Sequence, residues 1–291
     1  MGPCRARQLT EGMTQDTARK TTVVVTGATG RTGGRVARAA EAAGLTVRAA
    51  SRGTGFDWSD PSTWAEVLRG ADAAYLAYPT DIGAPEAAGA VGRLAGEAVA
   101  CGVRRLVLLS ARGEERARPA EEALRASGAD WTIVRAAWFT QNFSEGPLAE
   151  ELRLGGGLVF PAADAVREPF VDARDIADVV VAALTSNGRY AGRVIDVTGP
   201  RLLTWGEAVA EIGAAAGREL SYRAVPAREY RAHLTGFGVP AEEADFLIDL
   251  FEELLDGRNA HLSDGVERVL GRKPHDFTAF AKEAAEAGAW S

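Results

Sequence analysis

The apolar residues near the start of the chain form short β-branched runs separated by a helical stretch. Residues 21–26, TTVVVT, are an unbroken β-branched run, which suits a strand buried on both faces of a parallel sheet. A helix is expected from about residue 34 to residue 43, because the glycine at position 44 favours its termination. Residues 45–51, LTVRAAS, predict the second strand.

The same alternation of strands and helices continues to about residue 198. Strands separated by helices of about 10–15 residues predict βαβ units. The expected fold class is therefore α/β, with a Rossmann-type doubly wound parallel sheet. Further strands are expected at 55–58 (Gly55–Trp58), 73–78, 104–110, 131–136 and 193–198, and further helices at 85–100, 119–126 and 173–185.

A second, smaller lobe is predicted where this alternation loosens. Residues 138–168 hold a helical piece and the glycine-rich turn LGGGLVFP, and the chain from Gly199 onward is mainly helical. Amphipathic stretches lie at 205–217, 241–255 and 277–287. We expect a Rossmann-type domain from 21–136 and 169–198, and a smaller, mainly helical C-terminal lobe from 137–168 and 199–291.

The first segment, residues 1–20, is polar and has no periodicity, which favours a mobile N-terminal tail. Met13 is an alternative start of translation. N-terminal sequencing or the intact mass of natively produced protein would decide between Met1 and Met13.

The composition narrows the class of protein. With 46% hydrophobic residues, the 291-residue chain can build a sizeable core. A net charge of -7 and the lack of a basic stripe disfavour nucleic acid, and no apolar run has the length of a membrane span. Two cysteines, Cys4 and Cys101, and no secretory signal favour a reducing cytoplasm. The histidines His233, His261 and His275 are far apart, so no metal site is expected.

Three glycines follow the first predicted strand with GxxGxxG spacing. Gly27 permits a sharp turn off the strand, Gly30 lets the backbone approach a pyrophosphate, and Gly33 lets the helix pack close to the sheet. The pyrophosphate would lie on free N–H groups at the positive end of the helix dipole. A glycine-rich turn without a ligand is the alternative, but its place between strand and helix favours dinucleotide binding.

The end of the second strand indicates which dinucleotide binds. An NAD site would carry an acidic residue about twenty positions after the glycines, whereas this strand ends Ala50-Ser51-Arg52. Arg52 can pair with a 2′-phosphate, Ser51 can donate a hydrogen bond to it, and Arg31 can add a second cation. The expected cofactor is NADP(H), and a solvated surface arginine is the alternative reading of Arg52.

The carboxyl ends of the strands predict the rest of the site, because ligands of open α/β sheets bind there. Trp138 and Phe139 could form the wall of a pocket for a flat, apolar substrate, or they could be core between the lobes. Asp57 could reach the adenine edge or cap a turn. The candidate cofactor contacts are Gly27, Thr29, Gly30, Arg31, Thr32, Gly33, Ser51, Arg52, Asp57, Trp58, Ala77, Tyr78, Pro79, Ser110 and Ala111, and the candidate substrate contacts are Trp138, Phe139, Asn142 and Phe170.

Two carboxylates at the start of a later predicted helix have a structural interpretation. Asp172 and Asp175 open the segment ARDIADVVVAAL or lie in its first turn. A carboxylate there satisfies free N–H groups and suits the helix dipole. We expect capping, rather than catalysis, to be their role.

Several segments together resemble a known family. GATGRTG (27–33), ADWTIVRAAWFTQNF (129–143), EPFVDARDIADVVVAAL (168–184) and VTGPRLLTWGEAVAEIGAAAGRELSY (197–222) are similar to the NmrA-like, atypical short-chain dehydrogenase/reductase family. FDWSDPSTW (56–64) further resembles the subgroup similar to ergot-alkaloid reductases. The resemblance implies a Rossmann fold with a small C-terminal substrate lobe, NADP(H) binding and often reductase activity. It places the pyrophosphate at Gly27–Gly33, the 2′-phosphate at Arg52 and the nicotinamide near Trp138–Asn142.

The Tyr-xxx-Lys pair of typical short-chain dehydrogenases is missing from the sequence. In that pair the lysine lowers the tyrosine pKa for proton transfer. Tyr75, Tyr78, Tyr190, Tyr222 and Tyr230 are followed four positions later by Pro79, Ile82, Val194, Pro226 and Leu234. Reversible alcohol–ketone chemistry by that route is therefore not expected.

Hydride transfer without that pair is still chemically reasonable. An iminium ion accepts hydride directly, and a quinone or conjugated alkene can take its proton from water or a weak donor. Tyr78 and Ser110 are the candidate donors, and a carboxylate such as Glu122 would stabilise a cationic substrate.

Three functions follow from these features. The first is an NADPH-dependent reductase that transfers hydride to a C=N, C=C or quinone group of an apolar small molecule. The second is an NADP(H)-binding redox sensor or regulatory protein without turnover. The third is a non-redox isomerase or cyclase that retains the cofactor. The aromatic residues Trp138 and Phe139 and the helical lobe favour an enzyme.

Overall fold

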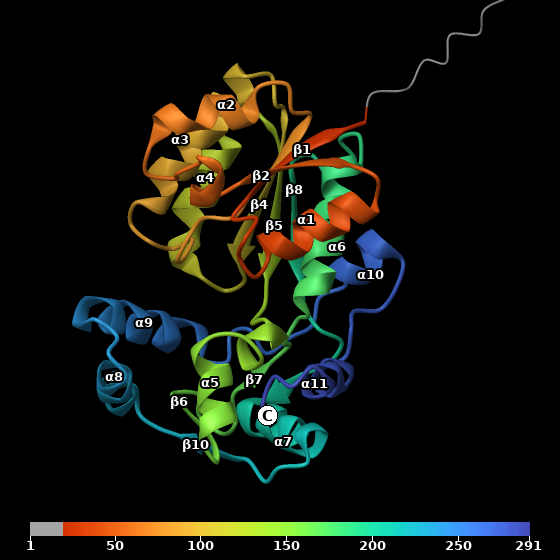
Figure 1. The fold of residues 1–291 in the computed structure, drawn as a ribbon. Coiled ribbons are helices and arrows are strands. Elements are labelled where there is room, and N and C mark those ends of the chain that lie inside the picture. The colour runs from red at the N-terminus through yellow and green to blue at the C-terminus, as the bar shows by residue number, and fades with distance from the viewer. Residues whose placement is uncertain (1–19) are drawn as a thin grey trace, which may run out of the picture.

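The central element of the protein is a six-stranded parallel sheet. The structure is a computed structural model, and it describes residues 20–291 (Figure 1). Met13 and all but the last residue of the predicted tail lie outside this range. The strands, in the order β2-β1-β3-β4-β5-β8, are β1 Thr22–Thr26, β2 Thr46–Ala50, β3 Ala73–Leu76, β4 Arg105–Ala111, β5 Asp130–Ala136 and β8 Arg193–Val197.

This order confirms the predicted α/β, Rossmann-type fold. All five pairings between neighbouring strands are parallel. The chain leaves β1 to form β2 on one side and then returns to form β3 on the other, so the direction of winding reverses between β1 and β3. A crevice forms at such a switch point, outside the carboxyl ends of the strands.

Alternating side chains of β1 supply the two faces of the core. Val23 and Val25 pack on one side of the sheet and Val24 on the other, and all three are fully buried. Figure 1 shows the helices as two layers on opposite faces of the sheet. One layer contains α2 Trp64–Leu68, α3 Ala87–Ala100 and α4 Arg118–Arg125, and the other contains α1 Gly33–Ala42 and α6 Ala173–Thr185.

The predicted strand at 55–58 was wrong. Arg52–Thr54 form a 3-10 turn, and residues 55–58 continue as loop. The Thr54 hydroxyl accepts a hydrogen bond from the Ser51 N–H at 2.9 Å, and Gly55 adopts a φ of 83°. This local hydrogen bonding competes with strand formation and turns the chain away from the sheet.

The lobe combines helices with two small sheets. The three amphipathic stretches form α7 Trp205–Ala216, α9 Ala241–Leu254 and α11 Phe277–Glu286, as predicted. The other elements are α5 Pro147–Leu154, α8 Ala227–Gly236, a parallel pair of β6 Gly157–Phe160 with β10 Ser221–Ala224, and an antiparallel pair of β7 Arg167–Glu168 with β9 Leu203–Thr204.

Aromatic side chains form the core of this lobe. The rings of Phe160 and Trp205 stack with centroids 4.1 Å apart. Phe143 packs against both Phe170 and Phe277, and the indole N–H of Trp290 donates to the Phe143 carbonyl at 2.7 Å. The C-terminus is thereby fixed to the segment that follows β5.

A short helix from the C-terminal region returns to the sheet domain. The helix α10, Gly265–Leu270, packs against α6 and β8, and Val266 joins their buried core. Gly265 approaches the strand so closely that an added Cβ would lie 1.9 Å from the Asp196 carbonyl oxygen. Within residues 20–291, no helix is long and apolar enough to cross a membrane.

Replacing Gly265 tests this close approach. Gly265→Ala should lower the free energy of unfolding by roughly 1–3 kcal/mol, because the methyl group must displace the backbone of β8. Gly96→Ala in α3 is the matched control, since a Cβ there meets no atom within 4 Å. That change should raise stability by about 0.4–1 kcal/mol. Urea unfolding of both variants gives the measurement, and equal midpoints would contradict the proposed packing.

Candidate cofactor and substrate site

A large cavity opens where the switch point predicts it. Its volume is about 1020 Å³, and it extends from the carboxyl ends of β1, β3, β4 and β5 to helices α8 and α9 of the lobe. The predicted residues that line it are Gly27, Thr29, Gly30, Arg31, Thr32, Ser51, Arg52, Asp57, Trp58, Ala77, Tyr78, Pro79, Ser110, Ala111, Trp138, Phe139 and Asn142. Gly33 and Phe170 do not line it.

The glycine turn has the geometry that a diphosphate requires. Gly27 has a φ of 61°, and its N–H donates to the Ala50 carbonyl at 3.0 Å. A Cβ on Gly33 would lie 2.1 Å from the Gly27 carbonyl oxygen, so only glycine lets α1 approach β1 so closely. No side chain caps the amino end of α1. Its N–H groups and helix dipole therefore suit an anion, and the residues fit the pyrophosphate of a dinucleotide.

The adenosine side of the cavity carries one exposed cation. Arg52 follows β2, and within residues 20–291 no hydrogen bond or ion pair holds its guanidinium. Asp57 accepts hydrogen bonds from the Ser59 N–H at 2.8 Å and the Ser59 hydroxyl at 2.7 Å. These two bonds, with the charge of Arg52, hold the Asp57 pKa below its usual value. The carboxylate of Asp57 therefore caps a turn.

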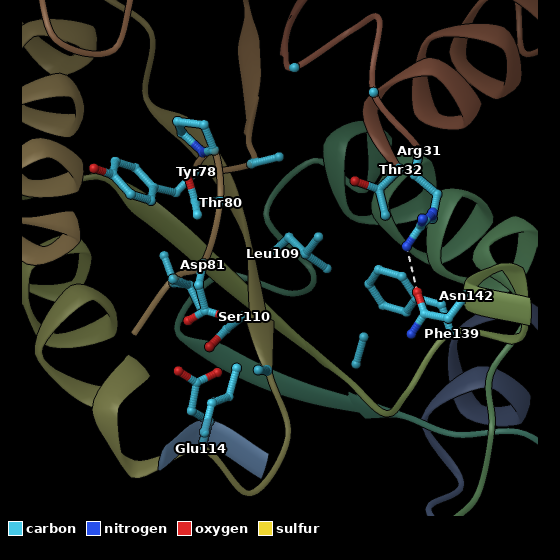
Figure 2. Close-up of a pocket in the computed structure, with 18 of the residues that line it drawn as sticks. Arg31, Thr32, Tyr78, Thr80, Asp81, Leu109, Ser110, Glu114, Phe139 and Asn142 are labelled. Carbon is cyan, nitrogen blue, oxygen red and sulfur yellow. Dashed lines mark hydrogen bonds between the residues drawn. The ribbon is translucent and has the colours of Figure 1, made fainter. Parts of the chain in front are cut away.

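Arg31 links the glycine turn to the lobe. Its guanidinium donates to the side chain of Asn142, as Figure 2 shows. The same guanidinium donates to the Glu145 carbonyl at 2.8 Å. It also pairs with the Glu145 carboxylate at 3.3 Å. The structure thus engages Arg31 in holding the segment after β5 over the cofactor turn.

Ser110 belongs to a buried polar network. Its hydroxyl donates to Glu121 Oε1 at 2.7 Å, and Arg135 donates to both oxygens of Glu121. Burial opposes ionisation of Glu121, but the hydrogen bonds from Arg135 and Ser110 outweigh it and hold the Glu121 pKa below its usual value. The Ser110 proton is therefore engaged. Glu122, the other carboxylate of this helix, is exposed and does not line the cavity.

The aromatic residues predicted for the substrate side have different positions. Trp138 and Phe139 line the cavity, and Trp138 packs edge-on against Phe160 and Trp205. Phe170 is only 2% exposed and lies inside the lobe core instead of at the cavity. Residues 168–171 are all buried, so aromatic character alone could not identify whether Phe170 faces the core or the cavity.

The two predicted helix-start carboxylates have structural roles. Asp172 is the N-cap of α6 and accepts from the Arg174 N–H at 2.8 Å, which confirms the prediction. Asp175 is fully buried and pairs with Arg272 and His275, so it fixes the C-terminal segment to α6. Within residues 20–291, no cluster of three or more potential ligands could hold a metal ion.

Sequence reasoning missed two carboxyl groups and the apolar wall of the cavity. Asp81 and Glu114 lie in the loops after β3 and β4 and line the cavity. Burial, with the neighbouring carboxyl of Asp81, raises the Glu114 pKa to about 9. From the sequence, both residues would be interpreted as solvent-exposed acids in loops. Their positions after predicted strands could have indicated that they line the site. The apolar wall comes from α9, with Leu247, Leu250, Phe251 and Leu254.

The chain belongs to the NmrA-like family, whose model matches residues 55–281, and the predicted family is thereby confirmed. It is 31% identical to the uncharacterized oxidoreductase YesF of Bacillus subtilis over 281 residues, covering 92% of this chain and 96% of that protein. It is 28% identical to the agroclavine dehydrogenase of Claviceps fusiformis over 280 residues, covering 90% and 96%. The second relative agrees with the resemblance to ergot-alkaloid reductases.

A solved structure has the same fold. The NADPH-dependent quinone oxidoreductase QOR2 of Escherichia coli, complexed with NADPH, superimposes with a TM-score of 0.73 at 21% identity. The match covers 90% of this chain and 99% of that one. The sheet and the lobe of the two proteins are therefore arranged alike.

Removing the charge of Glu121 should destabilise the fold. Glu121→Gln leaves Arg135 without its bidentate partner in a largely buried place, at a cost of about 3 kcal/mol. The Glu121 pKa is lowered, so its stabilisation is present above the ordinary value of 4.5 and is lost as the pH falls. The difference from wild type in thermal unfolding should therefore be large at neutral pH and shrink in acid. Glu122→Gln, the exposed neighbour, should change stability by less than about 0.5 kcal/mol.

Proposed function

We propose that the protein is an NADPH-dependent reductase that transfers hydride to a C=N, C=C or quinone group of an apolar small molecule. It does so without a Tyr-xxx-Lys pair. The observation that carries the proposal is a continuous cavity of about 1020 Å³ that joins the glycine turn to the apolar side chains of α9.

The family assignment supports the coarser part of this function. The chain is an NAD(P)-dependent oxidoreductase, and its cofactor is NADP(H). YesF is named an oxidoreductase, agroclavine dehydrogenase is named for an alkaloid, and QOR2 is named for quinones. These names agree with a small organic substrate.

Each part of the cavity would have a separate task. The amino end of α1 would hold the diphosphate, and Arg52 would pair with the 2′-phosphate. When bound, NADPH supplies a hydride. Trp138 and Phe139 would orient a flat acceptor, and the apolar side chains of α9 would exclude water from it.

The volume of the cavity favours an enzyme over a sensor. Drug-sized ligands occupy pockets of about 300–1,000 Å³, and this cavity continues beyond the cofactor turn to the lobe. The indole N–H of Trp138 is buried at the wall without a hydrogen-bond partner among residues 20–291. A protein that only sensed the nucleotide would not need an apolar chamber with such a donor.

Reversing the charge at Arg52 tests the choice of cofactor. Arg52→Asp should weaken NADPH binding by about 10- to 100-fold, because charge-assisted hydrogen bonds to the 2′-phosphate are lost. The affinity for NADH should change little or rise. Arg104→Asp is the control, since Arg104 is exposed and lies at the amino end of β4, whereas the cavity lies at the carboxyl ends of the strands. Calorimetric titration measures both affinities, and an unchanged NADPH preference in Arg52→Asp would refute this role.

Turnover with a defined panel tests the reaction. The protein and NADPH are mixed with imines, quinones and enones, and the absorbance of the reduced nicotinamide is followed. The proposed function requires its loss together with formation of the reduced acceptor. Tight NADPH binding without turnover on any acceptor would favour the sensor, and product formed without consumption of NADPH would favour an isomerase or cyclase.

A further inference from the structure

Two carboxyl groups face each other at the edge of the cavity. Asp81 lies in the loop after β3, and Glu114 lies in the loop after β4. Figure 2 shows both side chains pointing toward one another, with Ser110 beside them. The nearby strand ends are those at which the nicotinamide of a doubly wound sheet is expected.

Glu114 is held in an unusual environment for a carboxyl group. Its residue is only 3% exposed, and among residues 20–291 no N–H group donates to its carboxyl oxygens. The Asp81 carboxyl is the polar neighbour with which a protonated Glu114 can form a hydrogen bond. A Cβ on Gly83 would lie 1.8 Å from Glu114 Oε1, so the loop leaves room for this side chain only because residue 83 is glycine. Gly83 also donates its N–H to Asp81 Oδ1 at 2.7 Å, which orients the second carboxyl.

The charged groups around Glu114 favour its neutral form. Asp81 and Glu253 of α9 are acidic, and Arg116 is the opposing cation. Arg116 is shared with Asp249 and Glu253, each at 3.6 Å, so part of its charge is already compensated. Burial and the two neighbouring acids therefore outweigh it, and Glu114 carries a proton at neutral pH.

The two other candidate donors are less suited to this role. The Ser110 proton goes to Glu121. The Tyr78 ring packs edge-on against Trp58 at 5.2 Å and extends away from Ser110 and Phe139 in Figure 2. Burial, and then the charge of Glu86, raises the Tyr78 pKa, which makes its hydroxyl a weaker acid.

We propose that Glu114 is the proton donor of the reaction, and that the natural acceptor is a neutral, carbonyl-conjugated molecule, an enone or a quinone. This inference rests on the proposed reductase function. It selects among the three acceptor classes, because hydride addition to an iminium ion takes up no proton, whereas reduction of an enone or a quinone does. A protonated carboxyl at the cavity supplies that proton more effectively than water.

The step balances in atoms and electrons. Hydride adds to the electrophilic atom of the acceptor, and an electron pair moves to the carbonyl oxygen. The Glu114 O–H bond breaks as its proton passes to that oxygen, leaving a carboxylate and an enol or hydroquinone. The nicotinamide is oxidised and the acceptor is reduced by two electrons. Water then returns a proton to Glu114, and Asp81 acts as the positioning residue that favours this protonated form.

Infrared spectroscopy tests the protonation independently of turnover. In wild type, a protonated-carboxyl C=O band should persist at neutral pH and disappear with a midpoint near the Glu114 pKa of about 9. Glu168 is also buried and its pKa is raised to about 8, so the Glu114 band is obtained as the difference between wild type and Glu114→Gln. Asp81→Asn should move the midpoint of that difference band to lower pH. Glu115→Gln is the matched control, since its carboxylate is exposed and pairs with Arg118 at the surface, and it should leave the band unchanged. Loss of the wild-type band by pH 7 would overturn the proposal even if no variant folded.

Single-turnover kinetics test the transfer. With a naphthoquinone or a cyclic enone, Glu114→Gln should slow reduction by about 100-fold, while Glu115→Gln keeps the wild-type rate. A preformed iminium salt should be reduced by Glu114→Gln at a rate within a few-fold of wild type. Equal quinone rates and pH profiles in wild type and Glu114→Gln would overturn the role of Glu114 while leaving the reductase function intact. Failure of wild type to reduce any acceptor would instead refute the function, and the infrared result would still stand.

Discussion

The contact between the first turn of α1 and the end of β1 is the constraint on which the site depends. Gly33 lies against the Gly27 carbonyl at a distance that no side chain permits, and Gly27 itself adopts a left-handed conformation. The helix therefore begins directly at the carboxyl edge of the sheet, and no side chain caps its amino end, so the helix dipole favours an anion there. The cofactor site follows from this arrangement of backbone groups.

The lobe completes what the sheet edge begins. The segment after β5 crosses the cofactor turn, where Arg31 binds Asn142 and Glu145. It is then fixed to α6, because Gln141 donates to Asp172 at 3.0 Å and accepts from the Ala173 N–H at 2.8 Å. These polar contacts lie directly after Trp138 in the chain, so they restrict the position of this cavity-lining side chain. A shift of the lobe would disturb the cofactor turn as well as the substrate chamber.

The sequence was informative where local chemistry decides the structure. The β-branched run at 21–26 and the glycines after it predicted β1, the turn and α1, because a buried strand and a tight turn each restrict residue type. The strand at 55–58 was wrong, since hydrogen bonds of Thr54 outweigh the apolar pattern there. Glu114 escaped notice because its burial depends on Gly83 and on α9, which are distant in sequence. Phe170 was misplaced for the same reason, since only packing decides whether an aromatic faces a core or a cavity.

The central claim is that the amino end of α1 binds the diphosphate of a pyridine nucleotide. Isothermal titration calorimetry of the wild-type chain with NADPH tests it most directly. We expect a saturable heat of association with one nucleotide per chain, and an adenosine 2′-phosphate nucleotide should compete for the same site. A flat titration with both oxidised and reduced nucleotide, on protein shown to be folded, would contradict it.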